Sequence, residues 1–157
     1  MGPSDRTAMQ TIRTWLARLL QRKRPSGPAH LRAGAWGEEV AERLLVGKGY
    51  AIIGRNVRVG KKDEIDIIAH APDRVLVFVE VKTRANELFG RPFSAVDKRK
   101  RKTLSRAALR YMMRLRQKPD YFRMDVVEVV GTPEQKSPIV RHIENAFQLP
   151  ANKRIPW

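Results

Sequence analysis

Three residues near the middle of the chain combine charge with an apolar setting. Glu80 and Lys82 are two residues apart at the end of the segment VLVFVEVK, and Asp66 interrupts the apolar segment EIDIIA. Residues two apart in a strand face the same side of a sheet. A buried carboxylate and ammonium cost free energy unless an ion pair or a bound ion compensates them. These three residues are therefore the first candidates for a functional site.

Their spacing suits a metal-dependent hydrolase. A short turn joins the two segments and predicts that they pair antiparallel. If the register places Asp66 on the same face of the sheet as Glu80, the two carboxylates lie either directly opposite or diagonal to each other. The distance between diagonal residues is about 7–8 Å. Such oxygen ligands select Mg²⁺ or Mn²⁺, which would polarise a phosphoryl oxygen and activate a water. Lys82 would position that water or stabilise the developing charge. The alternative is a buried Glu80–Lys82 ion pair, with Asp66 as an ordinary strand-end acid.

A helix before the strands offers a third acid. It is predicted from about Leu31 to Lys48, with Gly49 as its stop signal. At about 100° per residue, Glu38 falls at the edge of the apolar arc, whereas Glu42 falls on the solvent side. We therefore expect Glu38 to reach the sheet and add a third carboxylate to the metal site, and Glu42 to face solvent.

The charge of the chain predicts a polyanionic partner. Its 157 residues include 32 Lys and Arg against 16 Asp and Glu, a formal net charge of +16. Nucleic acid is the first candidate, since phosphate neutralisation supplies most non-specific affinity, and anionic lipid is the second. A solvated cationic face remains the alternative.

Much of the charge lies on a second helix, predicted from about Ser94 to Arg116. Five consecutive basic residues stand near its start, and basic residues at a spacing of four follow. Such a stripe can follow a phosphate backbone. The residues predicted to bind nucleic acid, with DNA as the first candidate, are Arg55, Arg58, Arg84, Lys98, Arg99, Lys100, Arg101, Lys102, Arg106 and Arg110.

The remaining patterns complete the expected organisation. Strands are predicted over residues 50–55, 64–69, 75–82, 122–130 and 139–143. With the two helices they give an α/β domain of order α-β-β-β-α-β-β over residues 31–150. A basic N-terminal extension, residues 1–30, and a tail, residues 151–157, flank it. Residues 11–24 form a predicted amphipathic helix that would lie on a membrane surface, bind a partner or pack on the domain itself.

Several classes of protein are disfavoured. The chain has no cysteine, which excludes disulfides and fits a reducing cytoplasm. It has no apolar run of the roughly 18 residues needed for a membrane span, and no apolar core of a secretory signal. A glycine-rich phosphate loop is absent, which argues against an NTPase, and the scattered histidines argue against a zinc site.

The same residues carry a resemblance to a known family. The matching positions are Gly37-Glu38, Ala41, Leu44, Gly49-Tyr50, Arg55-Asn56, Arg58, residues 64–69 and 77–84, Ala95-Val96, Lys100, Leu104, Ala108, Tyr111, residues 125–127, Ile143 and Asn145-Ala146-Phe147. Over about residues 33–147 the chain resembles the small bacterial YraN family. Asp63 departs from it, because the family usually has glycine there.

The resemblance implies a fold and an activity. The family is similar to restriction-endonuclease-like proteins with a PD-(D/E)xK site and is related to archaeal Holliday-junction resolvases. It implies a central mixed β-sheet flanked by helices, with Glu38 as the helix acid, Asp66 and Glu80 as the strand acids and Lys82 as the lysine. It also implies a bacterial cytoplasmic protein that acts on DNA, branched or junction substrates among the candidates, and a homodimer as a candidate assembly. A nucleic-acid-binding module without catalysis is the alternative.

Overall fold

The computed structural model describes residues 28–61, 63–86 and 98–149. The elements of this part are α2 (Ala29–Gly47), β1 (Ala51–Arg58), β2 (Glu64–His70), β3 (Leu76–Arg84), α3 (Lys98–Arg114), β4 (Phe122–Val130) and β5 (Ile139–Phe147). The predicted α/β class and the order α-β-β-β-α-β-β are confirmed. Residues 1–27, which include the predicted helix 11–24, lie outside the described residues, as do residues 87–97 and the tail 151–157.

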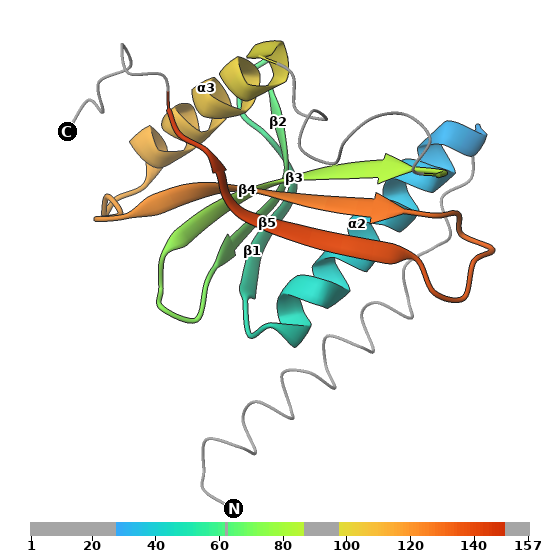
Figure 1. Ribbon diagram of the computed structural model, residues 1–157. Coiled ribbons are helices and arrows are strands. Elements are labelled where there is room, and N and C mark those ends of the chain that lie inside the picture. The colour runs from blue at the N-terminus through green and yellow to red at the C-terminus, as the bar shows by residue number, and fades with distance from the viewer. Residues whose placement is uncertain (1–27, 62, 87–97, 150–157) are drawn as a thin grey trace, which may run out of the picture. The chain divides into compact units, whose positions relative to one another are not determined.

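The chain divides into two units, residues 1–32 and 33–157, and the sheet belongs to the second. The five strands follow the order β1-β2-β3-β4-β5 (Figure 1). β3 and β4 are parallel, whereas the other neighbours are antiparallel, so the predicted mixed sheet is confirmed. A parallel pair needs a crossover connection, and α3 lies in the segment that joins β3 to β4.

Two hydrophobic cores cover the two faces of the sheet. Alternate residues of a strand point to opposite faces, and Phe78 and Val79 accordingly belong to different cores. The core with Phe78 includes Leu104 and Met112 of α3, and the core with Val79 includes Leu45 of α2. The helices therefore pack on opposite faces, and the parity of β3 places Glu80 and Lys82 on the α3 face.

Three strands end two or more residues beyond the ends that their sequence patterns predicted. β1 continues to Arg58 because Val57 and Arg58 pair with Ile65 and Glu64 of β2. β3 continues to Arg84, which pairs with Val130 of β4. β5 likewise runs beyond the predicted residue 143. The extra residues are partly polar, and their strand conformation is fixed by a neighbouring strand rather than by local apolar alternation.

The C-terminal end of α2 and its connection to β1 follow simple backbone rules. Gly49, just past the helix, has a φ of 85°, the left-handed conformation typical of a helix stop. Its backbone N–H donates a hydrogen bond to the carbonyl of Val46 at 2.9 Å.

Among the described residues, no helix has both the length and the apolar content to cross a bilayer.

Candidate functional site

Asp66 and Glu80 come together at the point where β2 separates from β3. The ladder between these strands runs from His70 opposite Leu76 to Ile67 opposite Val79, and Asp66 is the next residue beyond it. Continuing the register places Asp66 opposite Glu80. The Asp66 Oδ2 accepts a hydrogen bond from the backbone N–H of Val81 at 2.8 Å. The Asp66 carboxylate thus lies against the backbone of β3, beside Glu80.

Glu80 is buried, and its two carboxylate oxygens have different surroundings. Its side chain is only 2% exposed. Oε1 lies 2.9 Å from Lys82 Nζ and 3.1 Å from Lys100 Nζ. Oε2 is buried without a hydrogen-bond partner among the described residues. An unsatisfied buried acceptor is costly, about 1–3 kcal/mol, so Oε2 is a natural position for a ligand that accepts its lone pairs.

The ionisation of Asp66 reflects these surroundings. Burial raises the pKa of Asp66 to about 7, and the negative charge of Glu80 adds to this effect. The Val81 N–H and the charge of Lys100 act in the opposite direction but do not outweigh it. Two adjacent carboxylates repel each other, and either a proton or a cation relieves that repulsion.

Glu38 approaches from α2, the helix on the other face of the sheet. Its Oε2 accepts a hydrogen bond from Asn56 Nδ2 at 2.9 Å, and its negative charge contributes to the raised pKa of Asp66. The preceding residue, Gly37, lies so close to Thr83 of β3 that a Cβ built on it would be 1.8 Å from Thr83 Oγ1. This close helix–strand contact places Glu38 near the end of β3.

These groups fit a divalent cation held partly by its substrate. Within residues 28–61, 63–86 and 98–149, no three acidic or histidine side chains are grouped to hold a metal by themselves. Mg²⁺, however, commonly uses one or two carboxylates and completes its shell with waters and substrate phosphates. Asp66 and the partnerless oxygen of Glu80 supply that donor set, so the residues fit Mg²⁺ or Mn²⁺.

The prediction that Glu42 faces solvent is wrong. Glu42 is 2% exposed, and its Oε2 accepts a hydrogen bond from Arg55 Nε at 2.8 Å. A second guanidinium nitrogen of Arg55 contacts the other oxygen. The buried carboxylate is compensated by this two-point ion pair, which joins α2 to β1. Arg55, predicted to bind nucleic acid, therefore has a structural partner.

Asp63 has a similar role at the turn between β1 and β2. Its buried carboxylate accepts hydrogen bonds from Arg106 Nε and Arg110 Nη1, both at 2.8 Å. Its side chain is 1% exposed, whereas those of Arg106 and Arg110 are 39% and 50% exposed. The hydrogen bond from Arg106 is the main cause that lowers the pKa of Asp63. Two of the predicted nucleic-acid contacts therefore also hold this turn against α3.

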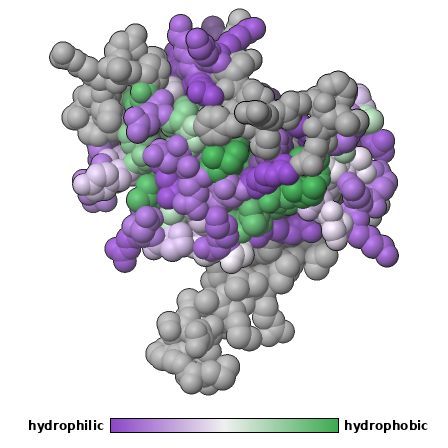
Figure 2. All heavy atoms as spheres, in the orientation of Figure 1, coloured by the Kyte–Doolittle hydropathy of each residue, from purple (hydrophilic) through white to green (hydrophobic). Residues whose placement is uncertain are grey.

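The other predicted basic residues differ in their surroundings. Lys98, Arg99 and Lys102 are exposed in the first turns of α3, whereas Lys100 is half-buried against Glu80. The guanidinium of Arg101 lies 5.8 Å from the ring centre of Phe147. At the surface, Arg58 Nε lies 3.3 Å from Glu64 Oε2. On the face drawn in Figure 2, hydrophilic residues surround a few hydrophobic patches.

Two buried acids of β4 were not singled out from the sequence. Glu128 lies between Lys82 and Arg141 in the registers of β3, β4 and β5, and Arg141 Nη1 is 3.1 Å from its Oε2. Arg84 Nε lies 3.7 Å from its other oxygen. The sequence did contain a signal for Glu128, because this acid interrupts the apolar run of β4. Glu128 thus holds Arg84 and Arg141 on the face that carries Lys82.

Asp125, the other acid, lies on the opposite face of β4. It accepts hydrogen bonds from His142 Nε2 at 2.8 Å, the Asn145 N–H at 2.9 Å and Arg123 Nε at 3.0 Å. The pairing of β4 with β5 shifts register beside it, and Asn145 has a φ of 49°. The carboxylate therefore satisfies the Asn145 N–H within this irregularity and pairs with two basic side chains, which is a structural role.

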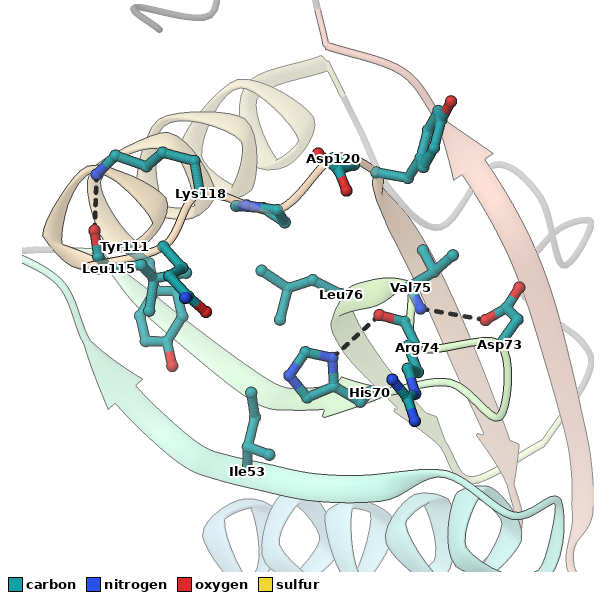
Figure 3. A pocket seen from close by; sticks show the side chains of 13 residues that line it. Ile53, His70, Asp73, Arg74, Val75, Leu76, Tyr111, Leu115, Lys118 and Asp120 are labelled. Carbon is teal, nitrogen blue, oxygen red and sulfur yellow. Dashed lines mark hydrogen bonds between the residues drawn. The ribbon is translucent and has the colours of Figure 1, made fainter.

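A pocket of about 430 Å³ lies at the other end of the β2–β3 hairpin (Figure 3). Its lining includes His70 and Leu76, each four residues along its strand from Asp66 and Glu80 respectively. Lys118 Nζ donates a hydrogen bond to the carbonyl of Leu115 at 2.8 Å. Figure 3 draws this hydrogen bond as a dashed line. None of the four predicted catalytic residues lines this pocket. The candidate site is therefore the carboxylate–lysine cluster, not the pocket.

Fold and site together define an α/β domain with a mixed five-stranded sheet and a carboxylate–lysine cluster beside a basic helix. Residues 37–129 match the model of the uncharacterised protein family UPF0102. The chain belongs to this family, which is the YraN family that the sequence motifs indicated.

Curated relatives match over most of their lengths. The chain is 46% identical to a UPF0102 protein of Symbiobacterium thermophilum over 74% of this chain and 96% of the relative. It is 41% identical to one of Pelobacter propionicus, over 78% and 86% of the two chains. A Clostridium acetobutylicum relative is 40% identical over 75% and 95%. No solved structure matches the chain significantly.

Proposed function

We propose that this chain is a metal-dependent endonuclease that hydrolyses phosphodiester bonds in DNA. One observation carries the proposal. The buried Glu80 presents an oxygen without a hydrogen-bond partner among the described residues beside Asp66, while its other oxygen holds Lys82 at 2.9 Å. This combination of two acids, a lysine and an unsatisfied acceptor suits phosphoryl chemistry better than a purely structural ion pair. The restriction-endonuclease-like relationship and the PD-(D/E)xK assignment belong to the same proposal.

Each residue has a role in this chemistry. Asp66 and Glu80 would hold Mg²⁺ or Mn²⁺, and Glu38 would complete the acid set through its charge near Asp66. When bound, the metal supplies Lewis-acid polarisation of the phosphoryl oxygen and a bound water of lowered pKa. The ammonium of Lys82, fixed by Glu80, would orient the attacking water or stabilise the charge that develops on the phosphoryl oxygens.

The substrate would be held by the basic residues around the site. Lys98, Arg99 and Lys102 expose their charge in the first turns of α3, the helix whose Lys100 contacts Glu80. Phosphate neutralisation by such residues supplies affinity without sequence preference. Branched or junction DNA is the proposed substrate, a homodimer is the proposed assembly, and the bacterial cytoplasm is the proposed location.

A cleavage assay tests the proposal. Labelled junction, nicked and linear DNA would be incubated with the full chain in Mg²⁺ or Mn²⁺. We expect cleavage by the wild type and by Asp73→Ala, because Asp73 is an exposed acid of the β2–β3 turn. Asp66→Ala should abolish cleavage. Indistinguishable behaviour of wild type and Asp66→Ala would refute the catalytic role.

A second candidate function is nucleic-acid binding without catalysis. The observation that favours it is the pair of ammonium groups within 3.1 Å of Glu80 Oε1, since they compensate the buried charge without a metal. This candidate predicts tight, salt-sensitive binding that survives Glu80→Ala, and no metal-dependent cleavage. A salt titration of DNA binding by wild type and Glu80→Ala, run beside the cleavage assay, separates the two functions.

A further inference from the structure

Lys100 shares a carboxylate oxygen with Lys82, although it belongs to another element. Its Nζ lies 3.1 Å from Glu80 Oε1, the oxygen that Lys82 contacts at 2.9 Å. Both ammonium groups therefore gather at one oxygen, while Oε2 lacks a partner among the described residues. Lys82 is fixed to β3, two residues from Glu80. Lys100 instead connects the acids to α3, the helix that exposes the basic residues.

The two lysines at Glu80 compensate the two strand acids without a metal. When Asp66 and Glu80 are both ionised, the ammonium groups of Lys82 and Lys100 cancel their charge, and Glu38 adds one further negative charge near Asp66. The charge of Lys100 acts on Asp66 as well as on Glu80. A divalent cation that bound Asp66 and Glu80 Oε2 would meet this positive charge at the same carboxylate, and like charges within about 4–6 Å oppose each other strongly.

Lys100 can leave this position more readily than the buried groups. Its side chain is 38% exposed, whereas that of Glu80 is 2% exposed. A lysine ammonium is a compact charge on a flexible four-carbon stem, which allows it to change partners without a backbone movement. A phosphate that approached the first turn of α3 would offer it an alternative anion.

We propose that Lys100 is a positioning residue that links metal binding to nucleic-acid binding. In the protein without ligands its ammonium compensates Asp66 and Glu80, and in the loaded protein it turns to a substrate phosphate. The inference rests on the proposed metal-dependent function and adds a coupling between its two ligands. Such coupling is reciprocal, so a phosphate that draws Lys100 from Glu80 favours the cation, and the cation favours the phosphate.

Mn²⁺ binding to the full chain without nucleic acid tests this coupling. Lys100→Met removes the competing charge and should tighten the Kd for Mn²⁺ about tenfold or more, since one nearby charge shifts ionisation equilibria by about 1–3 pKa units. Lys100→Gln should change the Kd in the same direction. Lys100→Arg keeps the charge and should remain near the wild type. Lys136→Met, at an exposed position between β4 and β5 that has no proposed role in binding, is the matched control and should have no effect. Calorimetry or electron paramagnetic resonance measures the Kd, and circular dichroism confirms folding.

Binding of labelled duplex DNA in Ca²⁺ gives the second readout. Lys100→Met should weaken DNA binding, and added DNA should tighten Mn²⁺ binding less in this variant than in the wild type. Unchanged or weaker Mn²⁺ binding by Lys100→Met would overturn the coupling and leave the nuclease proposal intact. Failure of every variant to bind Mn²⁺ would overturn both. Tighter Mn²⁺ binding by Lys100→Met without any DNA cleavage by the wild type would support the coupling and count against the nuclease.

Discussion

The contact between Gly37 and Thr83 predicts that a single added methyl group destabilises the domain. A Cβ on Gly37 would lie 1.8 Å from Thr83 Oγ1 and 3.0 Å from Thr83 Cβ. Rotation of the threonine can move Oγ1, but its Cβ is fixed to β3, so α2 must shift. Overpacking of this kind costs about 1–3 kcal/mol. Alanine recovers about 1 kcal/mol of helix propensity over glycine. We therefore expect Gly37→Ala to lose up to about 2 kcal/mol of unfolding free energy, the difference between these two effects.

Gly34 is the matched control, because it lies in the same helix and a Cβ added to it would have no neighbouring atom within 4 Å. Gly34→Ala should be neutral or should stabilise the domain by up to about 1 kcal/mol. Urea denaturation measures both variants. Thr83→Ala combined with Gly37→Ala should recover part of the loss, which a double-mutant cycle quantifies. Equal stability of Gly37→Ala and Gly34→Ala, or a cycle without coupling, would refute the steric explanation.

Three further predictions concern stability and its dependence on pH. Asp63→Asn should destabilise the protein at neutral pH, because the pKa of Asp63 is lowered on folding. The difference in stability from wild type should shrink as pH falls below the unfolded pKa of about 4 and vanish once the folded carboxylate is protonated, which urea unfolding at several pH values would measure. Because the pKa of Asp66 is raised to about 7, the stability of the wild type in EDTA should fall as pH rises from about 4 through 7. Asp66→Asn should flatten that fall, and equal slopes of stability against pH in both proteins would contradict the raised pKa. Phe78→Ala should lower the unfolding free energy by about 3–5 kcal/mol, because the ring is fully buried and packs edge-on against Tyr111 and Phe122. Calorimetry measures the loss, and a value below about 1 kcal/mol would contradict that packing.

The sequence predicted elements best where the local pattern and the tertiary environment agree. β4 begins and ends where its apolar run predicted, at Phe122 and Val130, since it is a central strand covered on both faces. β1 was predicted to end at residue 55, because the polar residues that follow become strand only through pairing with β2. A strand boundary set by a neighbour leaves little trace in the local sequence.

The candidate site was likewise predicted correctly where the local pattern was sufficient, and missed where a partner distant in sequence decides the outcome. Antiparallel pairing of β2 and β3 followed from the turn between them and placed Asp66 beside Glu80. The helical wheel misassigned Glu42, because it contains no information about Arg55, the partner that allows burial. The five basic residues at the start of α3 look equivalent in their charge pattern, although Lys100 alone among them matches the family. The packing of α3 shows what distinguishes it, because Lys100 lies at Glu80 whereas Lys98 is exposed.

The separation of β2 from β3 gives one backbone amide an unusual partner. The N–H of Val81 is bonded to the side chain of Asp66, where a continuing antiparallel ladder would supply a carbonyl. The exchange rate and the chemical shift of this amide proton should therefore follow the state of one carboxyl group. Nuclear magnetic resonance of Val81 would report directly whether Asp66 is protonated, ionised or engaged by a ligand, in a single spectrum and without any assay of activity.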